Sequence, residues 1–142
     1  YLEDEEKINK LKEEEDIDSE VINMLSKSNN MFLRMAVAIH QSTKKDILLI
    51  LSNDEEWDVK DAIDFRELPK EWKYLDSYEK VDKLQESENI DEKVLKILSK
   101  SRDFSIRLAV AENKLTPISI LQKLQNDDDD DVREAAKKSL KK

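Results

Sequence analysis

Apolar residues recur along this chain at the spacing of an α-helix. In 21–25, and again in 94–98, they occupy positions i, i+1, i+3 and i+4, which lie together on one helical face. No segment has the pattern expected of a strand. The periodicity therefore predicts an all-α protein. We expect helices near 4–14, 18–28, 31–40, 44–52, 57–65, 70–86 (either continuous or broken), 91–100, 104–112, 117–125 and 130–140.

Polar residues between these segments predict where helices begin and end. Thr116 before Pro117 is typical of an N-cap followed by the first helical residue. Thr43 and Asp76 each precede an acidic residue by three positions, the spacing of a capping box or a close variant. Pro69 is expected to open a short helix. Asparagine, the next choice after glycine for a left-handed C-terminal cap, marks the predicted breaks at 29–30, 53, 89, 113 and 126.

Two segments, 31–39 and 104–111, are apolar on nearly every side. A helix of this kind must be covered all round. We therefore expect both to be inner helices. Small side chains would let neighbouring helices approach them closely, namely those of Ala36, Ala38, Ala109 and Ala111.

The chain repeats itself. A shift of 73 residues aligns 1–63 with 74–136 without a gap, and 28 of the 63 aligned positions are identical. We interpret this as a tandem duplication within one helical-repeat domain, 1–142, with copy one at 1–73 and copy two at 74–142.

A shorter period lies inside each copy. A shift of 26 residues takes Leu98 to Leu124 and Leu25 to Leu51. Fixed periods of about 20 to 50 residues indicate a solenoid, in which each unit buries its apolar face against its neighbours. The expected fold is thus an α-solenoid of short antiparallel helix pairs.

One stretch resembles a known family. From Val94 to Pro117 the sequence reads Val-x3-Leu-Ser-Lys-Ser-x-Asp-x2-Ile-Arg-Leu-Ala-Val-Ala-x-Asn-x2-Thr-Pro, which is similar to the bacterial variant leucine-rich repeat and its HEAT-like relatives. The resemblance covers 17–63 and 90–136. It implies a right-handed superhelix that serves as a binding scaffold. Some HEAT-like proteins are DNA glycosylases, but none of their catalytic motifs can be matched here.

Composition excludes several kinds of function. The chain has no glycine and no cysteine, so phosphate-binding loops, thiolate metal sites and cysteine nucleophiles are excluded. Charged residues make up 42% of the chain and the net charge is −9. Its longest nearly apolar run, 31–39, is far shorter than the roughly 20 residues that span a bilayer. With an acidic start in place of a signal peptide, we expect a cytoplasmic protein that does not contact a membrane.

Four cations at equivalent positions are candidate partner-binding residues: Lys27 with Lys100, and Arg34 with Arg107. In a functional interpretation they form a repeated basic stripe for phosphate or acidic partners. In a structural interpretation they form ion pairs within a helix, since Asp103 stands four residues before Arg107.

Aromatic and acidic residues give further candidates. Trp57 and Trp72 lie near the junction of the two copies and are either binding anchors or packing residues. The acidic run 127–131 is a weak calcium candidate, because an EF-hand loop starting there would lack its glycine and its final glutamate; we expect it to begin a helix instead. His40, the only histidine, matches Asn113 and is expected at a helix end.

These observations favour a non-enzymatic scaffold that binds another protein. No catalytic, cofactor-binding or metal-binding residues are expected. One alternative is a nucleic-acid-binding module related to the HEAT-like glycosylases, although the net charge of −9 opposes phosphate binding. Another alternative is an acidic protein that occupies a basic site on its partner.

Overall fold

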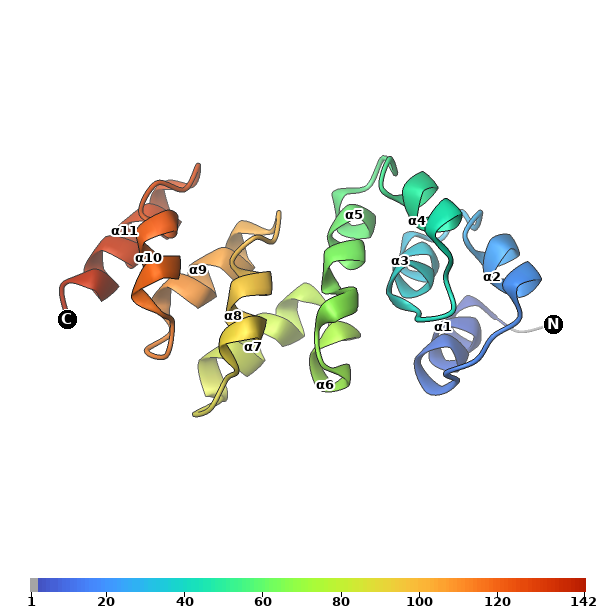
Figure 1. Ribbon diagram of the computed structural model, residues 1–142, viewed down its shortest axis with the longest axis horizontal. Helices are drawn as coiled ribbons and strands as arrows, with labels where there is room; N and C mark the ends of the chain where they lie inside the picture. The colour runs from blue at the N-terminus through green and yellow to red at the C-terminus, as the bar shows by residue number, and fades with distance from the viewer. Residues whose placement is uncertain (1–2) are drawn as a thin grey trace. The chain divides into compact units, whose positions relative to one another are not determined.

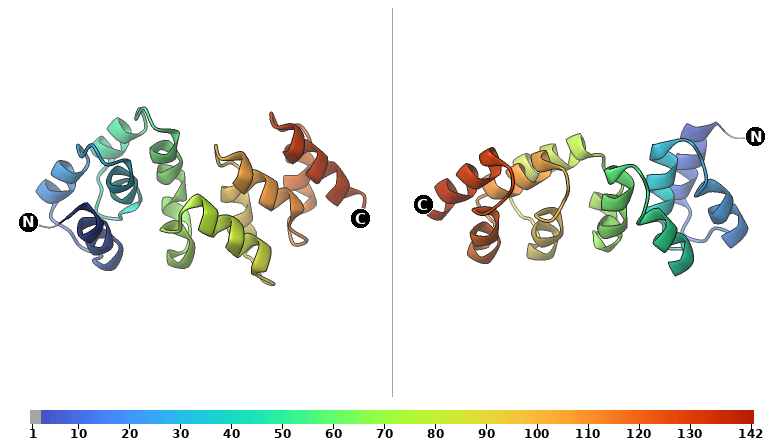
Figure 2. Two further views of the ribbon diagram at one scale, coloured as in Figure 1. Left: turned by 180° about the vertical axis from the view of Figure 1, so that it is seen from behind. Right: turned by 90° about the horizontal axis from the view of Figure 1, so that it is seen from above.

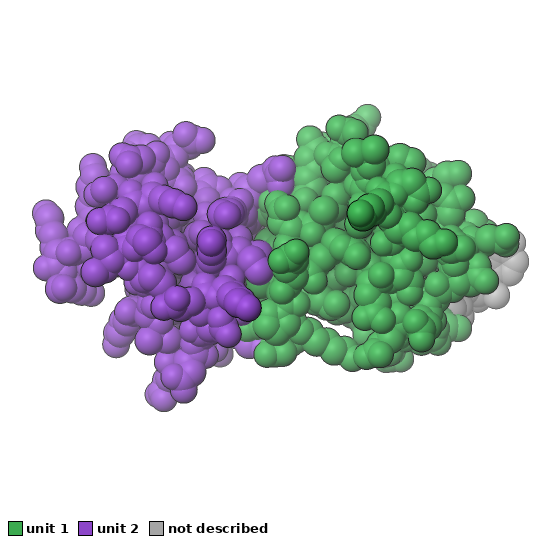
Figure 3. All heavy atoms as spheres, viewed as in Figure 1, with its two compact units in different colours: residues 1–74 green, residues 75–142 purple. Residues whose placement is uncertain are grey.

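The computed structural model describes residues 3–142 (Figure 1). Those residues form eleven α-helices and one short 3-10 helix and contain no strand, so the predicted all-α class is confirmed. None of the described helices is long and apolar enough to cross a membrane. The chain divides into two compact units, residues 1–74 and residues 75–142 (Figure 3).

Unit 1 is assembled around α3. Helices α1 and α5 pack along α3, and the short helices α2 and α4 also contact it (Figure 1). Ala36 and Ala38 are 4% and 0% exposed, as expected where neighbouring helices approach α3 closely, but Phe32 at its start is 59% exposed, so α3 is not covered all round. The helices of unit 1 are α1 (Asp4–Glu13), α2 (Ser19–Leu25), α3 (Met31–Ile39), α4 (Lys45–Leu51), α5 (Trp57–Asp64), the 3-10 helix η1 (Phe65–Glu67) and α6 (Lys70–Lys73).

Unit 2 has the same plan around α9 (Figure 2). Helices α7 and α11 pack along α9, while α8 and α10 contact it from the outer layer. Ala109 and Ala111 are 4% and 0% exposed, as expected for an inner helix. The helices of unit 2 are α7 (Ser77–Glu86), α8 (Glu92–Leu98), α9 (Phe104–Glu112), α10 (Ile118–Leu124) and α11 (Asp130–Leu140).

The corners between helices need no glycine because their backbone stays at negative φ. Among the described residues no φ is positive, so the prediction that asparagines form left-handed caps is wrong. Asn30 instead precedes α3, and its side-chain oxygen accepts hydrogen bonds from the N–H groups of Phe32 and Leu33. It is therefore an N-cap, which satisfies two of the free N–H groups that begin the helix.

Two predicted N-caps belong to the preceding helix instead. Thr43 and Thr116 do not cap α4 and α10, whose N-caps are in each case the next residue. Their hydroxyls donate back to the carbonyls of Val37 and Val110, at 2.5 and 2.6 Å. Both threonines are almost completely buried, and buried carbonyls near the end of a helix need a donor. The threonines therefore close α3 and α9.

The segment 70–86 is broken into α6 and α7. Pro69 is the N-cap of α6, as predicted. At the start of α7, Asp76 and Glu79 form a complete capping box, in which each side chain accepts a hydrogen bond from the backbone N–H of the other residue. The capping-box spacing in the sequence therefore predicted the start of α7 correctly.

Candidate functional site

A groove lined by lysines lies between α8 and α10 in unit 2 and has a volume of about 500 Å³. Lys93 and Lys96 line its α8 side one helical turn apart, on one face of the helix. Lys100 lines the same side from the turn that follows α8. Lys123 lines the α10 side. All four side chains are exposed. Within residues 3–142, none of the four ammonium groups has an ion-pair partner.

The wall of the groove is partly apolar. Ile120 and Leu124 line it and are 8% and 4% exposed. Two carboxylates also line the groove, those of Glu92 and Asp127. Asp127 is already bound to Arg107, so Glu92 is the only lining carboxylate that lacks a cationic partner within the described residues. The groove therefore carries a surplus of positive charge in a protein whose net charge is −9.

Of the predicted partner-binding residues, Lys100 lies in this groove and Lys27 does not. Lys27 is exposed at the equivalent position of unit 1, just after α2. The unit 1 residues that match Lys96 and Lys123 are Asn23 and Ile50. The corresponding surface of unit 1 thus lacks the cluster of lysines.

Arg34 and Arg107 have a structural role in both units. The Arg34 guanidinium donates to both carboxylate oxygens of Asp54, at 2.9 and 3.2 Å, and to the Ser28 carbonyl at 2.9 Å. Arg107 makes the same contacts 73 residues later, to Asp127 at 2.8 and 3.0 Å and to the Ser101 carbonyl at 2.8 Å. Arg34 therefore ties α3 to the corner that follows α4, and Arg107 ties α9 to the corner that follows α10.

The electrostatics of the Arg34–Asp54 pair follow from its geometry. The two side chains are only 16% and 11% exposed. Burial alone would raise the pKa of Asp54, but hydrogen bonds from Arg34 and the Glu56 N–H, together with the Arg34 charge, hold that pKa below its ordinary value of 3.8. The hydrogen bond to Asp54 in turn raises the pKa of Arg34. Both groups therefore stay charged at neutral pH.

The ion pair expected within α9 forms elsewhere. The Asp103 carboxylate accepts from the Ser105 N–H and caps the helix, while Arg107 binds Asp127, twenty residues further along the chain. A bidentate pair between fixed elements is more specific than a surface pair within one helix. Sequence spacing alone could not reveal that partner.

The two tryptophans have different surroundings. Trp57, the first residue of α5, is 42% exposed, whereas Trp72 in α6 is 5% exposed. Trp57 therefore retains surface that a partner could contact. The burial of Trp72 favours its interpretation as a packing residue.

The acidic run 127–131 begins a helix, as expected. Asp129 is the N-cap of α11 and accepts from the N–H groups of Asp131 and Val132. Asp127 accepts from the Asp129 N–H while it binds Arg107. These carboxylates are thus occupied by backbone N–H groups and a guanidinium. The described residues contain no group of three or more acidic or histidine side chains placed to hold a metal ion.

His40 joins the end of α3 to the end of α1. It is the C-cap of α3 and is 2% exposed. Its Nε2 donates to the Glu14 carbonyl at 2.6 Å, and its Nδ1 accepts from the Ser42 N–H at 3.0 Å. The cavity beside it is only about 40 Å³, room for roughly one water molecule. The predicted helix-end position is confirmed.

Asn113 makes similar bonds in unit 2: it accepts from the Leu115 N–H and donates to the Leu84 carbonyl, although the counterpart of Leu84 in unit 1 is Leu11 and not Glu14. We therefore predict that His40→Ala lowers the free energy of unfolding by about 2 kcal/mol, because it removes a buried ring and leaves the partly buried Glu14 carbonyl and Ser42 N–H without their partner. His40→Asn should cost about half as much, since an amide has the same donor and acceptor. Urea unfolding followed by circular dichroism measures both.

The control for this comparison is Gln41→Ala. Gln41 donates to the neighbouring Glu15 carbonyl at 3.0 Å from an exposed position, so its loss should change stability by no more than about 0.5 kcal/mol. Equal losses for His40→Asn and His40→Ala would show that the two hydrogen bonds do not explain this position.

Unit 1 exposes large apolar side chains on both α2 and α4. Val21 and Met24 on α2 are 43% and 71% exposed, and Leu49 and Ile50 on α4 are 68% and 70% exposed. Both helices pack on α3 through other positions, such as the fully buried Ile22. The apolar stripe of 21–25 is therefore wider than the surface that α2 buries.

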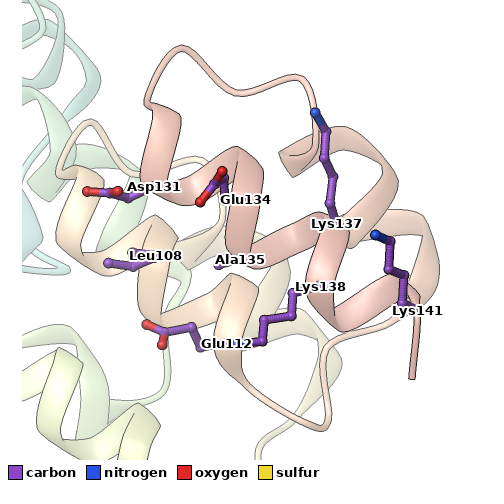
Figure 4. Close-up of a pocket in the computed structure, with 8 residues that line it drawn as sticks. All are labelled: Leu108, Glu112, Asp131, Glu134, Ala135, Lys137, Lys138 and Lys141. Carbon is purple, nitrogen blue, oxygen red and sulfur yellow. The ribbon is translucent and has the colours of Figure 1, made fainter.

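A second depression in unit 2 lies between α9 and α11 and has a volume of about 590 Å³. Figure 4 shows the carboxylates of Asp131, Glu134 and Glu112 toward one end and the amino groups of Lys137 and Lys141 toward the other. Charges of both signs are balanced here. This site therefore selects a ligand by charge less strongly than the α8–α10 groove does.

No protein-family model matches the sequence, and comparisons with curated proteins and with solved structures also find no match. The ammonium groups and apolar wall of the α8–α10 groove can hold an acidic, partly apolar ligand. The exposed side chains of α2 and α4 can be removed from water only by another surface.

Proposed function

We propose that this protein is a non-enzymatic helical-repeat scaffold that binds other proteins. In this proposal the chain is a right-handed α-solenoid that arose by tandem duplication of about 73 residues, and it is related to the HEAT-like and variant leucine-rich repeats. Support comes from the 28 identities among 63 aligned positions and from the matching Arg–Asp and threonine hydrogen bonds of the two units.

One observation gives the main support for the protein-binding role. Met24 on α2 and Ile50 on α4 stand 26 residues apart, the period of the helix pairs, and are 71% and 70% exposed. Leu49 beside Ile50 is 68% exposed. Helices α2 and α4 both contact α3, and large aliphatic side chains exposed at repeated positions are typical of an interaction surface.

The substitutions that test this role copy residues from unit 2. Leu49→Gln and Ile50→Lys introduce the residues found at 122 and 123. Because both side chains are exposed, the free energy of unfolding should change by no more than about 0.5 kcal/mol. Proteins retained from host lysate by the unchanged chain should be lost from the double variant. Quantitative mass spectrometry of the retained proteins measures this.

The matched control is Ile118→Gln, which removes an aliphatic side chain that is 66% exposed in unit 2. It should retain the same proteins as the unchanged chain. If the double variant retains them too, or if the unchanged chain retains nothing above empty beads, α2 and α4 do not form a protein-binding surface.

A further inference from the structure

The groove between α8 and α10 has a chemistry that differs from the apolar surface of unit 1. Two lysines of α8 and one from the turn that follows it line this groove together with Lys123, Ile120 and Leu124 of α10. We propose that this groove binds an acidic segment of a partner protein in which carboxylates alternate with aliphatic side chains. The inference rests on the proposed protein-binding function and assigns it a second site.

Charge complementarity identifies the occupant. Lys93, Lys96, Lys100 and Lys123 have no ion-pair partner among residues 3–142, although acidic residues outnumber basic ones by 34 to 25 in the chain. Of the two carboxylates that line the groove, Asp127 is held by Arg107, which leaves only Glu92 beside the four lysines. Acidic side chains of a partner would supply the missing counter-charges.

The size of the groove fits a short peptide segment. Helices α8 and α10 have seven residues each, which makes them about 10 Å long at 1.5 Å per residue. An extended chain covers that distance with three to four residues at about 3.3 Å each. Carboxylates of such a segment can reach the lysines while an aliphatic side chain contacts the small part of Ile120 that stays exposed.

A protein segment fits better than a nucleic acid. Nucleic acids bind through many phosphates along an extended basic surface. Here the cations are confined to one groove, and the acidic run 127–131 begins at the end of that groove. A short acidic peptide occupies the groove alone, whereas a duplex would extend past it toward those carboxylates.

The test is fluorescence anisotropy of the full chain with a labelled peptide of about twelve residues that repeats Glu-Leu-Asp. Lys96→Gln with Lys123→Gln should weaken binding about tenfold, the combined effect of two exposed ion pairs. The control, Lys27→Gln with Lys44→Gln, removes the same charge from exposed lysines of unit 1. It should bind within about twofold of the unchanged chain. Added salt should weaken binding in all three proteins.

Three further measurements distinguish this proposal from its alternatives. A peptide with Gln and Asn in place of the acids should bind at least tenfold more weakly. The Leu49→Gln/Ile50→Lys variant should bind the acidic peptide normally, which separates this site from the apolar surface of unit 1. The proposal would be overturned if the groove variant and the control variant lost equal affinity for the peptide. It would also be overturned if a mixed-sequence 20-base-pair DNA duplex bound more tightly than the peptide and that binding depended on Lys96 and Lys123.

Discussion

Arg34→Ala is expected to lower the free energy of unfolding by about 3 kcal/mol at pH 7. The substitution removes the bidentate partner of a carboxylate that is only 11% exposed and also leaves the Ser28 carbonyl without its donor. Breaking a largely buried ion pair from one side typically costs about 3 kcal/mol or more, because the remaining charge stays desolvated. Urea unfolding at pH 7 measures the loss.

The loss of stability caused by Arg34→Ala should depend on pH. In the native protein the pKa of Asp54 lies below 3.8, so its ionised form stabilises the fold above that pH, and this contribution is lost as the pH falls through the folded-state pKa. In the variant, burial without Arg34 should raise the pKa of Asp54 above its unfolded-state value. The stability difference should therefore be largest at pH 7 and smaller at pH 3.

Two controls separate the ion pair from general damage. Arg34→Ala combined with Asp54→Ala should be more stable than Arg34→Ala alone, because no buried charge remains. Lys27→Ala, at an exposed position, should change stability by about 0.5 kcal/mol or less. A loss below about 1 kcal/mol for Arg34→Ala, or a loss that does not depend on pH, would contradict this account of the pair.

Ala111→Leu is expected to destabilise the protein by about 3 kcal/mol. Ala111 is fully buried near the end of α9, and its carbonyl accepts from the Ser139 hydroxyl of α11 at 2.7 Å. A larger side chain at a position of this kind forces neighbouring helices apart, which typically costs about 1 to 3 kcal/mol. The melting temperature should fall with little change in helical circular dichroism at 20 °C.

The matched control is Ala135→Leu on α11. Ala135 lines the open depression between α9 and α11, so a leucine there has space and should change stability by about 0.5 kcal/mol or less. If Ala111→Leu is tolerated as well as Ala135→Leu, close packing around α9 is not what requires alanine at 111.

Local signals in the sequence predicted much of the helical structure. The capping residues Asp76 and Glu79 predicted the start of α7, and the continuous apolar segments 31–39 and 104–111 identified the two inner helices. These signals depend on residues within one or two turns of each other, so they can be recognised in the sequence without knowledge of the tertiary structure. The absence of glycine also agrees with a backbone that has no positive φ in its described part.

Only part of the candidate site could be predicted from the sequence. Lys100 was identified through its match with Lys27, but Lys93 and Lys96 were missed, although their spacing places both on one face of the predicted helix. Lys123 carried no local signal. It joins the other lysines only because α8 and α10 lie on opposite sides of one groove.

The sequence by itself determined the all-helical class and the two inner helices, because hydrophobic periodicity and capping act within single elements. Only the tertiary structure decided that Met24 is exposed, that Thr116 closes the preceding helix and that Arg107 binds Asp127. A seven-residue helix with apolar residues on several sides can bury any of them. Contacts with α3 and α9 choose which side chains are buried, and that choice leaves the remaining side chains available for binding.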